Sequence, residues 1–152
     1  NARIIKRFEK EKRRGMLGYA KQFFKEFFSV RPAKFTMSLN GSLKSFKAHM
    51  VVIANARQFG TGAIINPEGK TDDGVFEVCV IKPYPFWFTL KLLISLFTGN
   101  FHKQEYVKYY HAKKVEIVNK NRQTLQVDGE IVGNPLYVNA YILNKSLNVT
   151  VP

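Results

Sequence analysis

The spacing of hydrophobic residues changes from a helical to a strand-like period near residue 33. Between residues 16 and 30 apolar side chains recur every three or four positions, which predicts an amphipathic helix with an aromatic face. Residues 4–14 before it are highly charged and fit either a helix or a mobile segment. From residue 33 apolar and polar positions alternate instead, which predicts a β-strand that ends at Asn40-Gly41, a dipeptide typical of two-residue hairpins.

Short strand patterns dominate the remainder of the chain. Two helices are expected, over 86–98 and over 103–108, the first introduced by Pro83 and Pro85. Many short antiparallel strands with few helices predict an α+β domain that is mostly β, an antiparallel β-sandwich or barrel-like fold with peripheral helices. The expected strands after the first hairpin turn are 43–46, 49–55, 63–65, 75–81, 112–118, 123–127, 137–143 and 147–151.

Length and composition indicate one globular domain. A chain of 152 residues can bury one core and is too short for two. Its 13 Phe and 7 Tyr are typical of a folded protein rather than a disordered one. The single cysteine, Cys79, excludes an internal disulfide and a cysteine-based zinc site. Because Cys79 lies in an apolar run, we expect a buried strand residue and a reducing, cytosolic compartment.

The ends of the chain and its most apolar segment bear on its location. The N-terminus is polar and cationic and has no signal-peptide pattern. The segment 86–97 is interrupted by Lys91 and is shorter than the ~20 residues that span a bilayer, so a soluble or peripheral protein is expected. The chain begins without Met, and Asn1-Ala2 resembles the remnant of a cleaved tag. We therefore expect residues 3–152 to be a single domain taken from a larger protein.

The chain is strongly basic. Its 24 Lys and Arg against 11 Asp and Glu give a formal net charge of +13, which attracts polyanions such as nucleic acid or an anionic membrane. Two interpretations of the basic N-terminal cluster remain open, a solvated helix face and a binding surface. The cluster consists of Lys6, Arg7, Lys10, Lys12, Arg13, Arg14, Lys21, Lys25, Arg31 and Lys34.

All three aspartates lie in two short turns, Asp72-Asp73-Gly74 and Asp128-Gly129-Glu130. Each can be a plain turn, because Asp bonds to nearby backbone and Gly accepts positive φ. Each can also carry chemistry. A carboxylate with backbone carbonyls and waters suits Mg²⁺, and a free carboxylate can take a proton from a hydroxyl. Asp73 suits the first role and Glu130 the second.

Other catalytic patterns are missing from the sequence. The three histidines lack the i, i+4 spacing of a zinc helix, and no Walker loop, full GxGxxG or serine or cysteine nucleophile motif is present.

The order of the remaining motifs resembles the C-terminal half of the bacterial diacylglycerol kinase-like lipid kinases, relatives of the sphingosine and ceramide kinases. The motifs are Val51-Val52-Ile53-Ala54-Asn55 with Phe59-Gly60-Thr61-Gly62, then Asn66-Pro67, then Lys70-Thr71-Asp72-Asp73-Gly74-Val75-Phe76-Glu77-Val78, and finally Leu125-Gln126-Val127-Asp128-Gly129-Glu130. Each motif is weak alone, but the ordered set is specific and, with the helix of residues 15–28, covers nearly the whole chain.

The resemblance implies a NAD kinase/diacylglycerol kinase-like β-sandwich and a set of site residues. By position, Asp73 binds a structural Mg²⁺ through its side chain, and the backbone carbonyls of Lys70 and Val75 complete the protein ligands. Glu130 matches the general base that activates the lipid hydroxyl. Asn55, Gly60 and Gly62 match the family's segment that faces the substrate cleft. The turn residue Asp128 is assigned to the same cleft.

The sequence departs from the family pattern in one decisive respect. The GGDGT loop of the family's N-terminal α/β nucleotide-binding domain is not found in these 152 residues. We therefore expect ATP to be bound mainly by that separate domain and these residues alone to be inactive, because positioning the nucleotide supplies most of phosphoryl-transfer catalysis. Thr71 replaces a frequent aliphatic residue, and the segment 59–62 is less glycine-rich than usual.

These expectations define a leading function and two alternatives. The leading one is an ATP- and Mg²⁺-dependent kinase that phosphorylates a lipid hydroxyl such as that of diacylglycerol. We expect this kinase to be cytoplasmic and peripherally attached to an anionic membrane, where each surface Lys or Arg contributes about 1 kcal/mol to the binding free energy. The helix that begins at Phe86-Trp87-Phe88 either touches lipid or covers one face of the sandwich. Its expected partners are its own N-terminal domain and the lipid. A homodimer stays open.

The first alternative is a noncatalytic basic module that binds nucleic acid or membrane. We expect no nucleic acid partner, because no RNA-binding aromatic motif or recognition helix is present. The second alternative is an NAD kinase-related domain. Among lipids, diacylglycerol, a sphingoid base, phosphatidylglycerol and an undecaprenyl alcohol all remain open.

Overall fold

The computed structural model describes residues 31–59, 62–128, 130–144 and 146. The chain divides into two units, Asn1–Val30 and Arg31–Pro152, and the fold described below is that of the second. The helix expected over 16–30, the strand expected over 147–151 and the candidate cleft residue Gly60 therefore lie outside the described residues.

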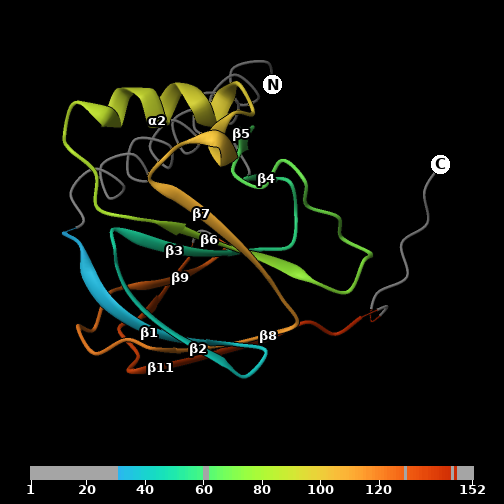
Figure 1. Ribbon diagram of the computed structural model, residues 1–152. Helices are drawn as coiled ribbons and strands as arrows, with labels where there is room; N and C mark the ends of the chain where they lie inside the picture. Colours follow the sequence, from blue (N-terminus) through green and yellow to red (C-terminus); the bar gives the residue numbers. More distant parts are fainter. Residues whose placement is uncertain (1–30, 60–61, 129, 145, 147–152) are drawn as a thin grey trace, which may run out of the picture. The chain divides into compact units, whose positions relative to one another are not determined.

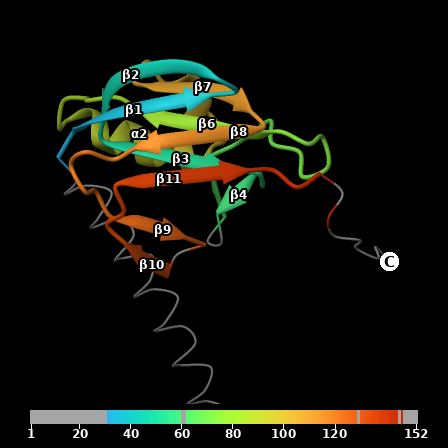
Figure 2. The ribbon, with the colours of Figure 1, turned by 90° about the horizontal axis from the view of Figure 1, so that it is seen from below.

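Two antiparallel sheets form the body of this unit, one above the other in Figure 1. The four-stranded sheet has the order β11-β8-β1-β2, and the three-stranded sheet has the order β3-β6-β7. Two strand pairs, β4-β5 and β9-β10, are separate from them (Figure 2). The bounds are β1 Ala33–Leu39, β2 Ser42–Ala48, β3 Met50–Ala54, β4 Gln58–Phe59, β5 Ala63–Ile64, β6 Phe76–Ile81, β7 Val107–Ala112, β8 Lys114–Val118, β9 Leu125–Val127, β10 Glu130–Gly133 and β11 Tyr137–Tyr141.

The chain changes sheets at two one-residue corners. His49 separates β2 from β3, and Lys113 separates β7 from β8. The predicted Asn40-Gly41 hairpin turn joins β1 to β2 with φ of 47° and 87°. Its Asn40 Oδ1 accepts the backbone N–H of Lys113 at 2.9 Å and of Lys114 at 3.2 Å. One side chain thus holds the hairpin turn against the second corner.

The core lies between the inner faces of the two sheets. β1 alternates buried and more exposed positions as its sequence predicts, and Met37 on its inner face is fully buried. Val115 of β8 and Val78 of β6 are also fully buried in the same core cluster. β6 is buried at every position, because the four-stranded sheet covers one of its faces and the helix α2 lies over the other (Figure 1).

The helix α2, Phe88–Phe97, confirms the helix predicted over 86–98 within slightly shorter bounds. It is the one α-helix of the described residues, and none of their helices is long and apolar enough to cross a membrane. The second predicted helix, over 103–108, is wrong. A 3₁₀ turn, η1 Phe101–Lys103, is followed by β7, whose valine and tyrosines favour a strand that pairs with β6.

The strand predicted over 112–118 is also incorrect in its extent, because Ala112 ends β7 in one sheet and β8 begins in the other. The fold class is confirmed as mostly β and sandwich-like, and the described sheets remain open rather than closing into a barrel.

Candidate functional site

The first acidic turn lies in the loop between β5 and β6, and it is built by its own side chain. Asp73 Oδ1 accepts the backbone N–H of Val75 at 3.0 Å, and Gly74 has a φ of 72°. Asp72 and Asp73 are both exposed. Asp73 therefore forms a turn through its own side chain, and because the residue is exposed a cation can still reach it.

An asparagine from the far end of the chain packs on this turn. A Cβ placed on Gly74 would lie 3.1 Å from both Cγ and Nδ2 of Asn144, which follows β11. A side chain at position 74 would therefore press on Asn144, which is exposed and would have to move aside slightly. This places the Asn144 amide beside Gly74, a proximity that no local sequence pattern indicates.

A buried pair closes the loop that carries Asp73. Asn66 is 1% exposed and its Nδ2 donates to Oε2 of Glu77, which is 3% exposed. Backbone bonds hold the same asparagine, from its N–H to the Arg57 carbonyl at 3.2 Å and from the Gly69 N–H to its own carbonyl at 3.1 Å. The loop that carries Asp73 is thus closed at its two ends by Asn66 and Glu77.

Further polar groups surround Glu77. His111 Nε2 lies 3.6 Å from Oε1 of Glu77, and the Tyr109 hydroxyl donates to the Ile65 carbonyl. Burial raises the pKa of Cys79 to about 12, and burial also raises the pKa of Tyr109, with the neighbouring Cys79 and Glu77 as further causes. Cys79 and Tyr109 are therefore protonated at neutral pH, and the cluster supports the loop rather than supplying a nucleophile.

The second acidic turn joins β9 to β10 as the predicted two-residue hairpin. Val127 pairs with Glu130 across the turn, and Asp128 has a φ of 49°. Asp128 and Glu130 are both exposed. Glu130 is therefore the first residue of a strand, with its carboxylate accessible to a substrate.

Two asparagines fix the base of this hairpin. Asn119 is 4% exposed; its Nδ2 donates to the carbonyls of Gln123 at 2.7 Å and Pro135 at 3.0 Å, and its Oδ1 accepts the Gln123 N–H at 2.9 Å. Asn134 Nδ2 donates to the Arg122 carbonyl at 2.7 Å. These bonds tie the segment before β9 to the segment after β10 and so hold the base of the hairpin that carries Glu130.

The structure does not bring the two acidic turns together. The loop of residues 66–75 and the β9-β10 hairpin are separated in both views of the ribbon (Figures 1 and 2). Of the remaining candidates, Asn55 and Lys70 are exposed, and Gly62 has a φ of 84° with open space beside it. The two carboxylates therefore belong to different local sites on this unit.

No group of three or more His, Cys, Asp or Glu that could hold a metal occurs among the described residues. A cation at Asp73 would thus depend on one carboxylate, carbonyls such as those of Lys70 and Val75, and water. This donor set fits Mg²⁺, which binds hard oxygen ligands and keeps several waters. The neighbouring amide of Asn144 adds a further polar group to the same turn.

Sequence reasoning found the two turns but missed Asn66, Asn119 and Asn144. Asn66 stood only as part of the Asn66-Pro67 motif, and Asn119 lies in the segment between the strands predicted over 112–118 and 123–127. What marks both residues in the structure is burial combined with hydrogen bonds to residues distant in sequence.

Comparisons with known proteins agree on the type of domain. The family model described as the YegS C-terminal NAD kinase beta sandwich-like domain matches residues 1–151. A comparison with curated proteins finds no match.

Three solved structures from Bacillus anthracis str. Sterne share the fold. Two of them are described as a putative diacylglycerol kinase, and both have a TM-score of 0.61 over 80% of this chain. One is 16% identical and is covered over 40% of its own length, and the other is 17% identical and is covered over 41%. A third, described as a diacylglycerol kinase, has a TM-score of 0.58 with 15% identity, over 76% of this chain and 42% of its own. The chain thus spans less than half the length of these proteins.

Proposed function

The chain belongs to the family of YegS C-terminal, NAD kinase beta sandwich-like domains, and we propose that it is the C-terminal domain of an ATP- and Mg²⁺-dependent lipid kinase that phosphorylates a lipid hydroxyl such as that of diacylglycerol. The family match over residues 1–151 carries the proposal. The exposed carboxylate of Glu130 supports it, because phosphoryl transfer to an alcohol needs a proton acceptor, and the exposed carboxylate of Asp73 offers a separate place for a structural cation.

Glu130 is the proposed general base. It is exposed at the start of β10, so its carboxylate is accessible, and Asn119 and Asn134 hold the base of the hairpin that carries it. In the proposed reaction Glu130 takes the proton of the lipid hydroxyl while that oxygen attacks the γ-phosphorus of ATP, and ADP leaves. Asn55, Gly62 and Asp128 are proposed to face the lipid; Gly60, assigned to the same cleft, lies outside the described residues.

Asp73 is the proposed metal ligand. Its Oδ1 is engaged by the Val75 N–H, which fixes the carboxylate and directs its second oxygen away from that bond. The carbonyls of Lys70 and Val75 are the proposed accompanying ligands. Bound there, Mg²⁺ would have a structural role, because it would order the turn by joining the Asp73 carboxylate to the backbone carbonyls. The proposed nucleotide-binding partner is a separate domain.

The test of the base compares Glu130 with a carboxylate outside both acidic turns, in the complete protein. Glu130→Gln should lower kcat for diacylglycerol phosphorylation by about 10²–10⁴ with little change in KM, the range for loss of general base catalysis. The control Glu116→Gln removes a partly exposed carboxylate of β8 that belongs to no proposed site and should stay within a few-fold of wild type. Transfer of ³²P from ATP to lipid in mixed micelles measures both, and wild-type kcat in Glu130→Gln would exclude it as the base.

The acceptor itself is tested with the same assay. Diacylglycerol, a sphingoid base, phosphatidylglycerol and an undecaprenyl alcohol are compared, with NAD as the acceptor that the family's NAD kinase relation suggests. Phosphorylation of NAD without phosphorylation of any lipid would overturn the lipid assignment.

The metal assignment has a readout of its own. Asp73→Asn should weaken Mg²⁺ binding about tenfold or more, whereas the adjacent and equally exposed Asp72→Asn should have little effect. Mg²⁺-dependent thermal stabilisation of the purified protein measures this without turnover. Equal Mg²⁺ responses in Asp73→Asn and wild type would contradict the assignment.

A further inference from the structure

One face of α2 is strongly apolar and faces solvent. The helix buries Phe88, Leu92 and Leu96, which confirms that it covers the unit's core. On its other side five large apolar residues are exposed, three in the helix and two just before it. They are Phe86 at 88%, Trp87 at 72%, Leu90 at 65%, Ile94 at 56% and Phe97 at 53% exposure. Residues 90, 94 and 97 follow helical spacing, so the outer face of α2, as we call these five residues, is continuous. Exposed apolar patches of this kind mark interaction surfaces.

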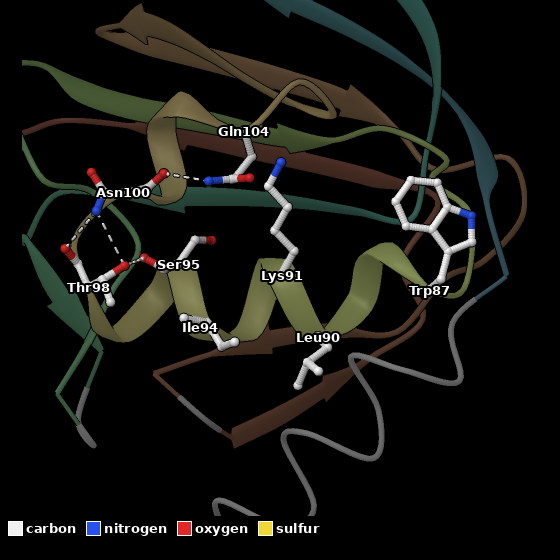
Figure 3. Close-up of a pocket in the computed structure, with 8 residues that line it drawn as sticks. All are labelled: Trp87, Leu90, Lys91, Ile94, Ser95, Thr98, Asn100 and Gln104. Atoms are coloured by element: carbon white, nitrogen blue, oxygen red, sulfur yellow. Dashed lines mark hydrogen bonds between the residues drawn. The ribbon is translucent and has the colours of Figure 1, made fainter.

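A mainly apolar groove with a cation runs along the same helix. It lies between α2 and the segment 98–104 and has a volume of about 390 Å³. Leu90, Lys91 and Ile94 all line it, and Figure 3 shows the Lys91 ammonium directed to the Gln104 side of the helix, with Leu90 and Ile94 on the other side. The Lys91 Nζ lies 5.0 Å from the centroid of the Phe88 ring. Apolar and cationic groups thus occupy adjoining strips of one helix.

Charge decides which partner suits this surface. The segment 82–108 carries four lysines and one glutamate, within a chain of net charge +13. A second copy of this chain would bring like charges together, whereas an anionic bilayer complements them. Aromatic residues at one end of a short amphipathic helix are typical of helices that lie in the headgroup region, with the apolar face inserted by about 5–10 Å.

We propose that the outer face of α2 docks on an anionic lipid bilayer, with Lys91 contacting headgroup phosphates in the adjoining groove. The proposal deepens the proposed function, because a lipid kinase must reach a substrate that stays in the membrane. Its physical support, the exposed apolar face and the cation beside it, is independent of catalysis.

A paired substitution tests the surface. Leu90→Asp/Ile94→Asp should lower the partition coefficient of the purified protein onto phosphatidylglycerol:phosphatidylcholine vesicles by about tenfold or more, because it places charge where side chains enter the bilayer. The control is Leu43→Asp, which changes a 72% exposed leucine on β2 and should leave partitioning unchanged. Sedimentation with vesicles measures all three proteins, and circular dichroism verifies that each is folded. Wild-type partitioning of the double variant would overturn the proposal.

The only tryptophan of the chain, Trp87, reports directly on this surface. Its emission should shift to the blue on anionic vesicles and should be quenched by brominated acyl chains. Unchanged Trp87 emission under conditions where the protein sediments with vesicles would place the contact elsewhere and reject α2.

Lys91→Gln should weaken binding to anionic vesicles about fivefold and make it less sensitive to NaCl, with no effect on phosphatidylcholine vesicles. Equal anionic-vesicle affinity of Lys91→Gln and wild type would reject the headgroup contact.

Two outcomes separate this proposal from its competitors. If the wild-type protein is a dimer and the Leu90→Asp/Ile94→Asp variant a monomer by light scattering, with equal vesicle binding, the face is a contact between copies and the proposal fails. If vesicle binding depends on α2 but no lipid is phosphorylated, the surface stands and the kinase assignment fails.

Discussion

At the residue scale, Gly69 shows how a buried side chain restricts its neighbour. A Cβ at position 69 would lie 2.2 Å from Nδ2 and 2.8 Å from Cγ of Asn66. Asn66 cannot turn aside cheaply, because it is 1% exposed and bonded to Glu77. Gly69→Ala should therefore lower the free energy of unfolding by about 1–3 kcal/mol through overpacking.

The adjacent exposed Lys70→Ala provides the control and should stay within about 0.5 kcal/mol. Urea denaturation measures both variants, and equal midpoints would show that Asn66 does not hold the position described.

The thiol of Cys79 predicts a pH dependence of stability. Burial raises its pKa from 9.0 to about 12. In the unfolded chain the thiol ionises above pH 9, whereas the folded protein keeps it neutral up to about pH 12, so its ionisation favours unfolding as pH rises between these values. Tyr109, whose pKa is also raised, acts in the same direction.

The two contributions can be separated with Cys79→Ser, which does not ionise in this range. The free energy of unfolding of wild type, relative to that of Cys79→Ser, should fall by roughly one to a few kcal/mol between pH 8 and 11. Guanidinium denaturation measures both proteins. A difference that stays constant with pH would mean that the thiol is not buried in neutral form.

At the element scale, the β9-β10 hairpin depends on its base rather than on its own pairing. Val127, Ile131 and Val132 are at least half exposed, so little apolar burial holds the hairpin. Isolated two-stranded hairpins are marginally stable, so the bonds of the buried Asn119 must stabilise this one. Asn119→Ala should destabilise the hairpin by about 1–3 kcal/mol, because it leaves buried backbone groups without partners.

Hydrogen exchange measures that effect locally. Amides of β9 and β10 should exchange faster in Asn119→Ala than in wild type, while those of β6 stay protected. The exposed neighbour Lys120→Ala should change neither, and unaltered hairpin exchange in Asn119→Ala would show that another contact fixes the base.

The same elements show what the sequence could predict. The Asn40-Gly41 turn, the alternation of β1 and the helix α2 follow from local patterns, and so do the Asp73 and Glu130 turns. The false helix over 103–108 arose because the segment has no clear alternation and becomes a strand only by pairing with β6. Asn66, Asn119 and Asn144 could not be found this way, because each is defined by partners that no periodicity places beside it.

At the scale of the whole molecule, excess positive charge opposes the folded state. The chain has 24 cationic and 11 anionic side chains, and its first 30 residues alone carry nine Lys and Arg against three Glu. Among the described residues, one ion pair joins a Lys or Arg to a carboxylate. It links Lys114 Nζ to Glu116 Oε1 at 2.9 Å, and both side chains are exposed. Repulsion among the remaining cations destabilises compact conformations more than expanded ones.

Screening should therefore stabilise this protein. Raising NaCl from 20 to 200 mM shortens the Debye length to below about 10 Å, and Tm should rise by a few degrees. Sulfate at equal ionic strength should raise Tm further if the cationic side chains of the folded protein bind anions. Differential scanning calorimetry measures both, with Lys114→Gln as the control that removes the exposed pair and should change the salt response little. A Tm that falls with NaCl would mean that attractive pairs outweigh the repulsion, contrary to the charge distribution from which docking on an anionic membrane is inferred.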